Sequence, residues 1–284
     1  MSASSVVTTL DSEKASAKHG QLYWAFHDGF VVTWRNVMAI SREPELIFFS
    51  IIQPIIFIVL FAYVFGGAIQ VPGGNYKNFL LPGVFVQTIA FAGAATSVGM
   101  SEDMTKGIID RFRSLPMARS AVLTGRTLGD LLRAILTIVI MSITGLAIGW
   151  RITSSFGAAV AAYALLLAFG YAMSWIGCYI GLSVPNPEVA STAGLVWLFP
   201  LTFVSNAFVP TQSMPSWLQP IAEWNPISSI VAAERQLFGG APMFTPGAPF
   251  PEKYGIPLSI GWIALILVIF VPLAVRKYRM SGLK

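Results

Sequence analysis

Six long stretches of mostly apolar residues constrain the fold of this chain more than any other feature of its sequence. A helix that crosses a bilayer needs about 20 such residues. The six stretches cover about 46–65, 79–100, 128–150, 156–184, 190–209 and 256–275. Charged residues make up only 11% of the chain, against about 25% in soluble domains. The sequence therefore predicts an all-α integral membrane protein with six transmembrane helices.

The basic residues are distributed unevenly between the two sides of this predicted membrane domain. Of the 18 lysines and arginines, 14 fall in the N-terminal segment, the loop after the second stretch, or the C-terminal tail. The other four are Lys77, Arg151, Arg235 and Lys253. Lysine and arginine concentrate on the cytoplasmic side of membrane proteins. We therefore expect both termini in the cytoplasm, with the chain in the plasma membrane of a bacterium.

The chain reads as one membrane domain with a short polar extension. Residues 1–20 are polar, contain no apolar core followed by a cleavage site, and are expected to be a flexible cytoplasmic N-terminus. Residues 21–284 show no repeat or low-complexity linker and are expected to form a single transmembrane domain. Because Cys178 is the one cysteine, the sequence predicts neither a disulfide nor a cysteine metal site.

Residues 21–42 have the pattern of an amphipathic helix, which Pro44 would end. One helical face carries Leu22, Phe26, Phe30, Trp34, Val37 and Met38. Arg35 and most other polar side chains of the segment lie off that face. Aromatic residues favour the headgroup boundary, so we interpret this segment as an interface helix on the membrane surface. A second interpretation is a lever that also contacts a soluble partner.

Ten of the 31 charged residues fall between residues 101 and 133, in the loop after the second stretch. Within this loop an apolar stripe is formed by Met104, Ile108, Phe112 and Leu115, with Arg111 and Arg113 pointing elsewhere. Pro116 would end the helix. A solvated connector would explain the charge, but it would not explain the stripe. The pattern favours a cytoplasmic helix that docks in a groove of another protein.

The segment 205–255, on the opposite side, is apolar but broken by Pro210, Pro215, Pro220 and Pro226. Two short helices are expected, one within 214–224 and one over 227–237, with Glu234 and Arg235 near its end. Neither is long enough to span, so we expect a re-entrant or interfacial hairpin before the last transmembrane helix. A packed outer cap and a gate over an exit are both compatible with this pattern.

Several kinds of chemistry lack their sequence signatures. There is no phosphate-binding G-x-x-x-x-G-K-[ST] motif, and His19 and His27 do not have metal-ligand spacing. Asp130 and Arg133, at the cytoplasmic start of the third stretch, are three residues apart and are expected to pair locally. Ion-coupled carriers usually need acidic residues inside the membrane, so their scarcity argues against that class.

Three runs of sequence resemble the membrane subunit of type-2 ABC exporters, and specifically the daunorubicin-resistance type of permease. They are RFRSLPMARSAVLTGR at 111–126, MPSWLQP with EWNPI at 214–227, and RQLFGG at 235–240. The resemblance extends from about residue 21 to the end of the chain. It implies that the stripe residues belong to a coupling helix, which docks on a partner ATPase. Residues 21–42 would form a second contact with that ATPase.

The resemblance also implies the partners of the chain. Two copies of a separate ABC ATPase would bind ATP and magnesium, and a second permease subunit, identical or related, would pair with this one. The chain itself would hold no cofactor, and we expect membrane lipids but no nucleic acid among its partners. ATP binding would then drive export of a hydrophobic or amphipathic cargo, either a drug or a lipid.

With so few charges in the predicted spans, the cargo path should be largely uncharged. The residues expected along it are Phe85, Gln87, Phe91, Phe199, Phe203 and Asn206. The two amides are favoured because a buried amide requires hydrogen-bond partners. For any single aromatic residue, helix packing or lipid contact is the favoured explanation. The alternative functions are a stand-alone ion-coupled carrier or channel and, with no catalytic cluster to support it, a membrane-embedded transferase or hydrolase.

Overall fold

The computed structural model describes residues 44–65, 76–108, 121–239 and 249–280, and within these ranges every regular element is a helix. The long helices are α3 (Pro44–Leu60), continued by the π-helix η1 (Phe61–Phe65), α4 (Tyr76–Thr105), α6 (Ala121–Ala147), α7 (Phe156–Gly181), α8 (Pro187–Phe203), α10 (Pro226–Phe238) and α12 (Gly255–Met280). Shorter elements are η2 (Thr211–Ser213), α9 (Gln219–Glu223) and α11 (Phe250–Lys253). Four of the described helices, α4, α6, α7 and α12, contain segments long and apolar enough to cross a membrane. The prediction of an all-helical membrane protein is confirmed for the described residues.

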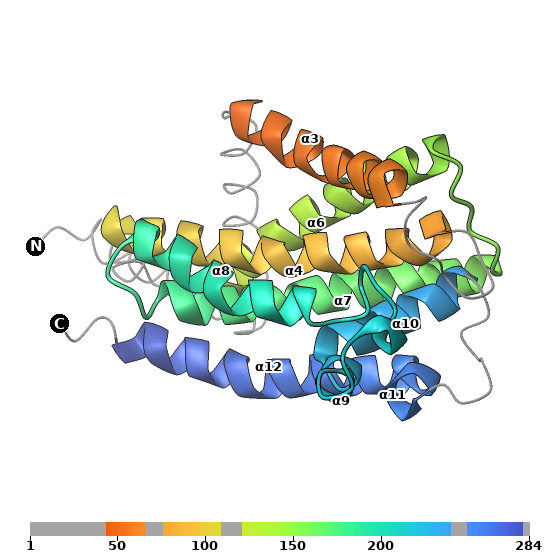
Figure 1. Ribbon diagram of the computed structural model, residues 1–284. Coiled ribbons are helices and arrows are strands. Elements are labelled where there is room, and N and C mark those ends of the chain that lie inside the picture. The colour runs from red at the N-terminus through yellow and green to blue at the C-terminus, as the bar shows by residue number, and fades with distance from the viewer. Residues whose placement is uncertain (1–43, 66–75, 109–120, 240–248, 281–284) are drawn as a thin grey trace, which may run out of the picture.

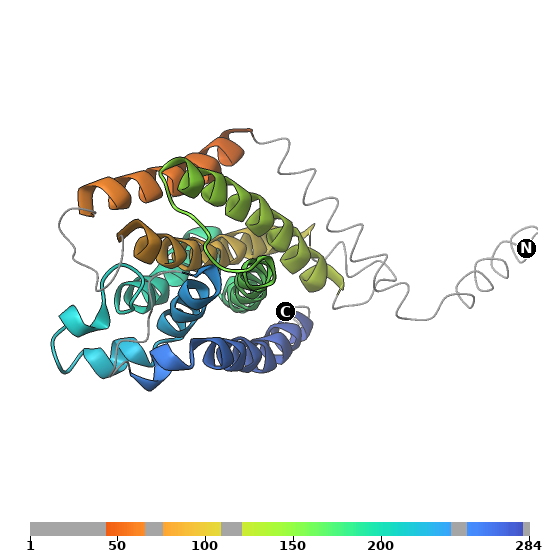
Figure 2. The ribbon, with the colours of Figure 1, turned by 90° about the vertical axis from the view of Figure 1, so that its right-hand side faces the viewer.

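Helix α4 lies at the centre of the bundle (Figures 1 and 2). It packs most extensively against α7 and α8, while α12 packs on α7 and α10. Figure 2 shows α3 and α6 together on one side of α4 and α12 on the other. The short helices α9, α10 and α11 gather at one end, opposite the C-terminal ends of α4 and α12 (Figure 1). The two ends of the bundle therefore differ in structure: one carries the short helices, and the other carries the C-terminal ends of α4 and α12.

Glycines allow α4 and α7 to approach until their backbones touch. A Cβ atom built on Gly177 would lie 2.2 Å from the carbonyl oxygen of Gly93. A Cβ atom on Gly93 would in turn lie 2.8 Å from the carbonyl oxygen of Met173. In a lipid environment, where burial of apolar side chains supplies little driving force between helices, close contact through small residues is a main source of packing energy.

An aromatic cluster anchors the end of α10 in the bundle. Phe238 makes edge contacts with Trp150 and Tyr163, with ring centroids 5.2 Å apart in both cases. Phe85 of α4 completes the cluster, 5.6 Å from Trp150 and 6.0 Å from Phe238. Phe85, Trp150 and Phe238 are all buried. The helix that follows the proline-rich segment is thus part of the core.

The predicted stretch 190–209 is shorter as a helix, because α8 ends at Phe203. The side-chain amide of Asn225 donates to the carbonyl oxygens of Leu201 and Val204, at 2.7 and 2.6 Å. The same side chain accepts from the backbone N–H of Ile227 and caps α10. Asn225 therefore joins the end of α8 to the start of α10 and turns the chain away from a continued span.

The hairpin before α12 also differs in detail from the prediction. The helix expected within 214–224 is α9, which is limited to five residues because Pro215 and Pro220 have no N–H to donate within a longer helix. The second predicted helix matches α10 closely. Glu234 and Arg235, which we expected on the outer side, are buried, with exposed fractions of 0% and 2%.

The predicted stripe of the charged loop is divided by the end of α4. Met104 lies on the last turn of α4, and Gly107 has a left-handed backbone with φ of 66°. Since few residues other than glycine adopt that conformation, Gly107 separates Met104 from Ile108. The remainder of the stripe, and the predicted interface helix at 21–42, lie outside the described residues.

Candidate functional site

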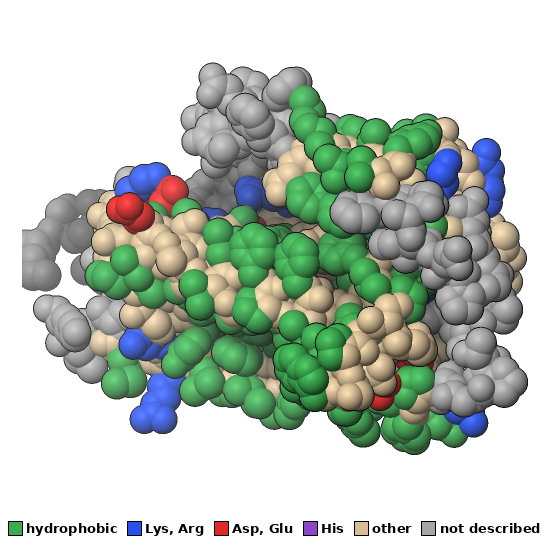
Figure 3. Space-filling view, viewed as in Figure 1, with side chains coloured by type: hydrophobic (Ala, Val, Ile, Leu, Met, Phe, Trp, Pro, Cys, Tyr) green, Lys and Arg blue, Asp and Glu red, His purple; other side chains and the backbone are tan. Residues whose placement is uncertain are grey.

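A cavity of about 290 Å³ lies between α3, α4, α6 and α8. Figure 3 shows a recess between α3, at the top, and the band of hydrophobic side chains over α4 and α8. The cavity is lined by Gln53, Pro54, Phe57, Gln87, Thr88, Ile89, Phe91, Ala92, Ala95, Asp130, Arg133, Ala134, Thr137, Phe199 and Phe203. Ligand sites are typically concave and mainly apolar with a few polar groups, and this lining has that composition.

Aromatic rings form one wall of the cavity. Phe91 and Phe199 meet edge to face with their centroids 5.3 Å apart. Phe199 stacks on Phe203, with centroids 5.8 Å apart. Both α8 rings are about half exposed, at 47% and 52%. Rings held in this way offer flat apolar surface to a ligand while they keep their own packing partners.

Polar side chains interrupt the cavity lining on α3, α4 and α6. Gln87 is 5% exposed, and its amide has no hydrogen-bond partner among the described residues. Gln53 of α3 also lines the cavity, but it is exposed. A buried amide without partners is costly, so the amide of Gln87 offers unused hydrogen-bonding capacity to an occupant.

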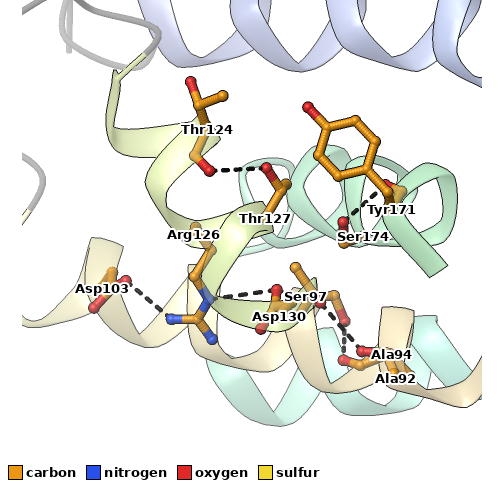
Figure 4. A network of polar contacts seen from close by, with 11 residues as sticks. Ala92, Ala94, Ser97, Asp103, Thr124, Arg126, Thr127, Asp130, Tyr171 and Ser174 are labelled. Carbon is orange, nitrogen blue, oxygen red and sulfur yellow. Dashed lines mark hydrogen bonds and ion pairs between the residues drawn. The ribbon is translucent and has the colours of Figure 1, made fainter. Parts of the chain in front are cut away.

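A chain of charged groups leads from the cavity to the end of α4 (Figure 4). Thr96 donates to the carboxylate of Asp130 at 2.8 Å, and Nε of Arg126 lies 3.8 Å from the same oxygen. Nη1 of Arg126 donates to Asp103 at 3.2 Å. The guanidinium of Arg126 also occupies the space beside Gly99 where any other residue would place its Cβ atom.

The contacts refine the expectation that Asp130 pairs with Arg133. Arg133 does act electrostatically on Asp130, but the ion pair within 4 Å is with Arg126, one turn earlier on α6, where Asp103 and Thr96 of α4 hold both groups in place. Asp103 lies two residues before the end of α4. The network therefore joins the end of α4 to the wall of the cavity.

Replacing Arg126 with glutamine is expected to lower the free energy of unfolding by about 2 kcal/mol, because Asp103 and Asp130 are only 17% and 13% exposed and would lose their shared cation. Thermal unfolding of the purified protein in mild detergent measures this loss. The control is Lys106→Gln, which affects an exposed pair with Glu102 at 3.0 Å and should cost no more than about 0.5 kcal/mol. Equal losses for the two variants would contradict the role given to Arg126.

A second polar cluster lies at the other end of the bundle, around Arg235 of α10. Its Nε donates to the carbonyl oxygen of Phe79 at 2.9 Å, and its Nη2 donates to those of Asn206 and Ala207 at 2.8 and 3.2 Å. The guanidinium also lies 3.4 Å from the centroid of the Phe79 ring. Arg235 thus ties α10 to the start of α4 and to the turn after α8, and we assign it a structural role.

Glu234, next to Arg235, is buried without a hydrogen-bond partner among the described residues. Burial raises the pKa of its carboxyl group well above the ordinary value. Among the described residues no group of three or more potential metal ligands is close enough to hold an ion. Within the described residues, we therefore assign the cluster around Arg235 a structural role: it holds the hairpin together.

The structure brings together four of the residues expected along a cargo path. Gln87, Phe91, Phe199 and Phe203 line the cavity. Phe85 lies instead in the aromatic core. The backbone carbonyl oxygen of Asn206 accepts from Arg235, while its buried side-chain amide has no hydrogen-bond partner among the described residues. The remaining expected site residues, apart from Met104 and Ile108, fall outside the described residues; they are Arg111, Phe112, Arg113, Leu115, Phe26, Phe30, Trp34 and Arg35.

Sequence reasoning did not place Asp130 and Arg133 in a site, although both line the cavity. A signal for them was present on α6. Arg126, Asp130, Arg133 and Thr137 recur at spacings of four, three and four residues, which puts them on one helical face. A polar face on a helix that is otherwise apolar indicates a polar interior or cavity beside it.

Comparison with known proteins points to one family. The family model described as ABC-2 type transporter matches residues 28–238. The daunorubicin resistance ABC transporter permease protein DrrB1 of Streptomyces coeruleorubidus is 35% identical over 246 residues, which cover 87% of this chain and 84% of that protein. The doxorubicin resistance ABC transporter permease protein DrrB of Mycobacterium tuberculosis is 27% identical over 216 residues, covering 73% and 75% of the two chains.

Proposed function

This chain belongs to the ABC-2 type transporter family, and we propose that it moves a hydrophobic or amphipathic cargo out of the cytoplasm or inner leaflet. As the permease subunit of an ABC exporter it is not itself an enzyme. The observation that carries the cargo proposal is the cavity between α3, α4, α6 and α8, which combines an aromatic wall with the buried amide of Gln87. Both a drug and a lipid-like molecule fit this lining. The names of the two relatives support the drug.

In this proposal ATP and magnesium bind to a separate ATPase, two copies of which sit beneath a pair of permease subunits. The docking surface is the loop at 109–120 with its flanks, where Ile108, Phe112 and Leu115 supply apolar contact and Arg111 and Arg113 orient it. The amphipathic segment 21–42 is a second contact. The ion network of Arg126 supports this division of labour, because it connects the end of α4 nearest the loop to the cavity wall.

We propose six membrane crossings, with both termini in the cytoplasm of the cell. Four of them are the long helices α4, α6, α7 and α12. The others are α3 with η1, which together cover residues 44–65, and α8. The hairpin of α9 to α11 then lies at the outer surface, opposite the loop that receives the ATPase. The hydrogen bonds from Asn225 to Leu201 and Val204 support α8 as a crossing, because they end this helix where the hairpin begins.

The experiment that tests this function reconstitutes the chain in liposomes together with a partner ABC ATPase and follows ATP-dependent transport of daunorubicin. The double variant Phe112→Ala with Leu115→Ala should weaken binding of the ATPase and reduce ATP-dependent transport by about tenfold or more. The reason is that truncating an apolar anchor in an interface costs about 2 kcal/mol of binding free energy. The matched control is Phe156→Ala, which removes an aromatic side chain that is 86% exposed at the start of α7.

Normal ATP-dependent transport by the double variant would contradict the docking role of the loop. Transport by the purified chain alone, abolished by dissipating an ion gradient, would instead support a stand-alone carrier. Asp130 and Arg133 in the cavity wall are the observation that favours this second function, since ionisable groups inside a membrane domain often take part in ion coupling. The two functions are therefore separated by whether the chain needs its ATPase.

A further inference from the structure

We propose that Gln87 is the specificity-determining residue of the cavity, and that it binds a ring carbonyl or hydroxyl group of a compact, flat polycyclic cargo. The proposal rests on the proposed export function and names the group of the cargo that the permease recognises. It depends on three features of the lining: charged groups that balance one another, a buried amide without a partner, and aromatic rings on two walls. Recognition is then by neutral hydrogen bonding and stacking, and the net charge of the cargo has little effect.

The charged side chains beside the cavity are engaged with one another. Asp130 accepts from Thr96 at 2.8 Å and lies 3.8 Å from Nε of Arg126, which also pairs with Asp103. Arg133 acts electrostatically on Asp130 as well. A charged cargo would have to compete with these contacts and would also lose its own water. Two arginines balance two aspartates, so the described part of this wall has no net charge with which to select a cargo.

Gln87 is the one polar residue of the described lining that is buried, with an exposed fraction of 5%. It lies in the apolar part of α4, and its amide has no hydrogen-bond partner among the described residues. Taking an amide out of water without a partner costs free energy. A ring carbonyl can accept from its Nε2, and a ring hydroxyl can donate to its Oε1. A cargo with either group removes this cost, and a cargo without one does not, so the amide discriminates between them.

Aromatic rings border the cavity on the α3 side as well as on the α4 and α8 side. Phe57 of α3 stacks on Phe61 with centroids 5.7 Å apart, and Phe61 stacks on Phe208 at 4.8 Å. Phe208 contacts Phe203 of α8 at 5.7 Å, and Phe203 stacks on Phe199. Phe57, Phe199 and Phe203 line the cavity. Because aromatic faces pair well with other flat rings, this lining favours a planar cargo.

The volume of the cavity favours a compact molecule. At about 290 Å³ it lies at the lower limit of small-molecule sites, which span about 300 to 1,000 Å³. A few fused rings match this space better than a phospholipid with two acyl chains does. The ester carbonyl of a lipid is nevertheless a hydrogen-bond acceptor like a ring ketone, so the test has to separate these two sources.

The test is equilibrium dialysis of two matched molecules against the purified full chain in nanodiscs of phosphatidylcholine. Fluorenone and fluorene share one flat tricyclic frame, but only fluorenone carries a ring carbonyl. Empty nanodiscs correct for partition into lipid. The wild-type chain should bind fluorenone about fivefold more tightly than fluorene, which corresponds to one net neutral hydrogen bond.

The variant Gln87→Met keeps the length of the side chain, removes its hydrogen-bonding atoms, and should bind the two molecules equally. The same variant should unfold at an equal or higher temperature, because it removes a buried amide that has no partner. A glutamine with only a structural role would lower the unfolding temperature when replaced. The control is Gln212→Met, at an exposed position of η2 outside the cavity, which should keep the full preference for fluorenone.

Two further arms test charge and lipid. Daunorubicin and N-acetyldaunorubicin share one chromophore and differ in the charge of the amino group, and their dissociation constants should agree within about twofold. Binding that is about tenfold weaker after acetylation would mean that the cavity reads charge, and would overturn the proposal. In nanodiscs of ether-linked phosphatidylcholine, which has no ester carbonyl, the affinity for fluorenone should not change. Tighter binding there would show that Gln87 holds a lipid ester, and would overturn the assignment of a polycyclic cargo.

A wild-type chain that binds fluorenone no more tightly than fluorene, or that binds neither, would overturn the proposal. A preference for fluorenone that persists in a folded Gln87→Met variant would overturn it equally. The assay requires neither ATP nor an ATPase. A negative result here is therefore distinct from a failure of the coupling experiment, which tests the export function.

Discussion

Replacing Gly177 with leucine is expected to prevent α4 and α7 from packing and to lower the free energy of unfolding by about 3 kcal/mol or more. The Cβ atom would lie 2.2 Å from the backbone oxygen of Gly93 and 2.9 Å from the Cβ atom of Thr96. Backbone atoms of a neighbouring helix cannot move aside as a flexible side chain can. Thermal unfolding in mild detergent, followed by the monodisperse fraction on size exclusion, measures the loss.

The control for this prediction is on the same helix. Gly157 has open space where a Cβ atom would be built. Since leucine favours helix more than glycine does by up to about 1 kcal/mol, Gly157→Leu should leave stability unchanged or raise it slightly. Gly177→Ala should fall between the two. If Gly177→Leu unfolded at the same temperature as Gly157→Leu, the close contact of α4 and α7 would not be what holds them together.

Replacing Arg235 with methionine is expected to have the second largest effect, a loss of about 3 kcal/mol in the free energy of unfolding. The side chain donates to three carbonyl oxygens: the bonds to Asn206 and Ala207 are buried, and the bond to Phe79 is partly buried. Each buried acceptor left without its donor costs about 1 to 3 kcal/mol. Limited proteolysis of the hairpin at 204–239 should speed up in parallel, because Arg235 ties that hairpin to α4.

Arg151 provides the matched control for Arg235. It also donates to carbonyl oxygens, those of Leu146 and Trp150, but its side chain is exposed and water can replace it. Arg151→Met should therefore cost less than about 1 kcal/mol. Arg235→Lys should recover part of the loss, because it keeps the cation but not the planar fork. A loss for Arg151→Met as large as that for Arg235→Met would show that burial is not the cause.

The helices were more predictable than the site because they depend on local properties of the chain. The pattern around Pro226 predicted α10 to within a residue or two, since proline, an asparagine cap and a following glycine mark helix ends directly. The shorter end of α8 was missed, because it depends on a hydrogen bond from Asn225, which is 21 residues away from Val204.

The candidate cargo residues show the same division. Gln87 was found because an amide in an apolar helix requires an explanation wherever it points. Phe85 and Phe91 could not be distinguished, since an apolar helix is hydrophobic on all sides and has no face that marks the cavity. The structure places Phe85 against Trp150 and Phe91 against Phe199, and only the second pair reaches the cavity.

The sequence by itself determined that this chain is a helical membrane protein, because a bilayer requires each spanning segment to satisfy its own backbone hydrogen bonds and to be apolar over its length. Both requirements can be read one segment at a time. Only the tertiary structure decided that α3, α4, α6 and α8 enclose a cavity and that Arg126 joins its wall to the end of α4. Those features arise from the distances and crossings between helices. Close contacts such as that of Gly177 with Gly93 set these distances, and hydropathy does not encode them.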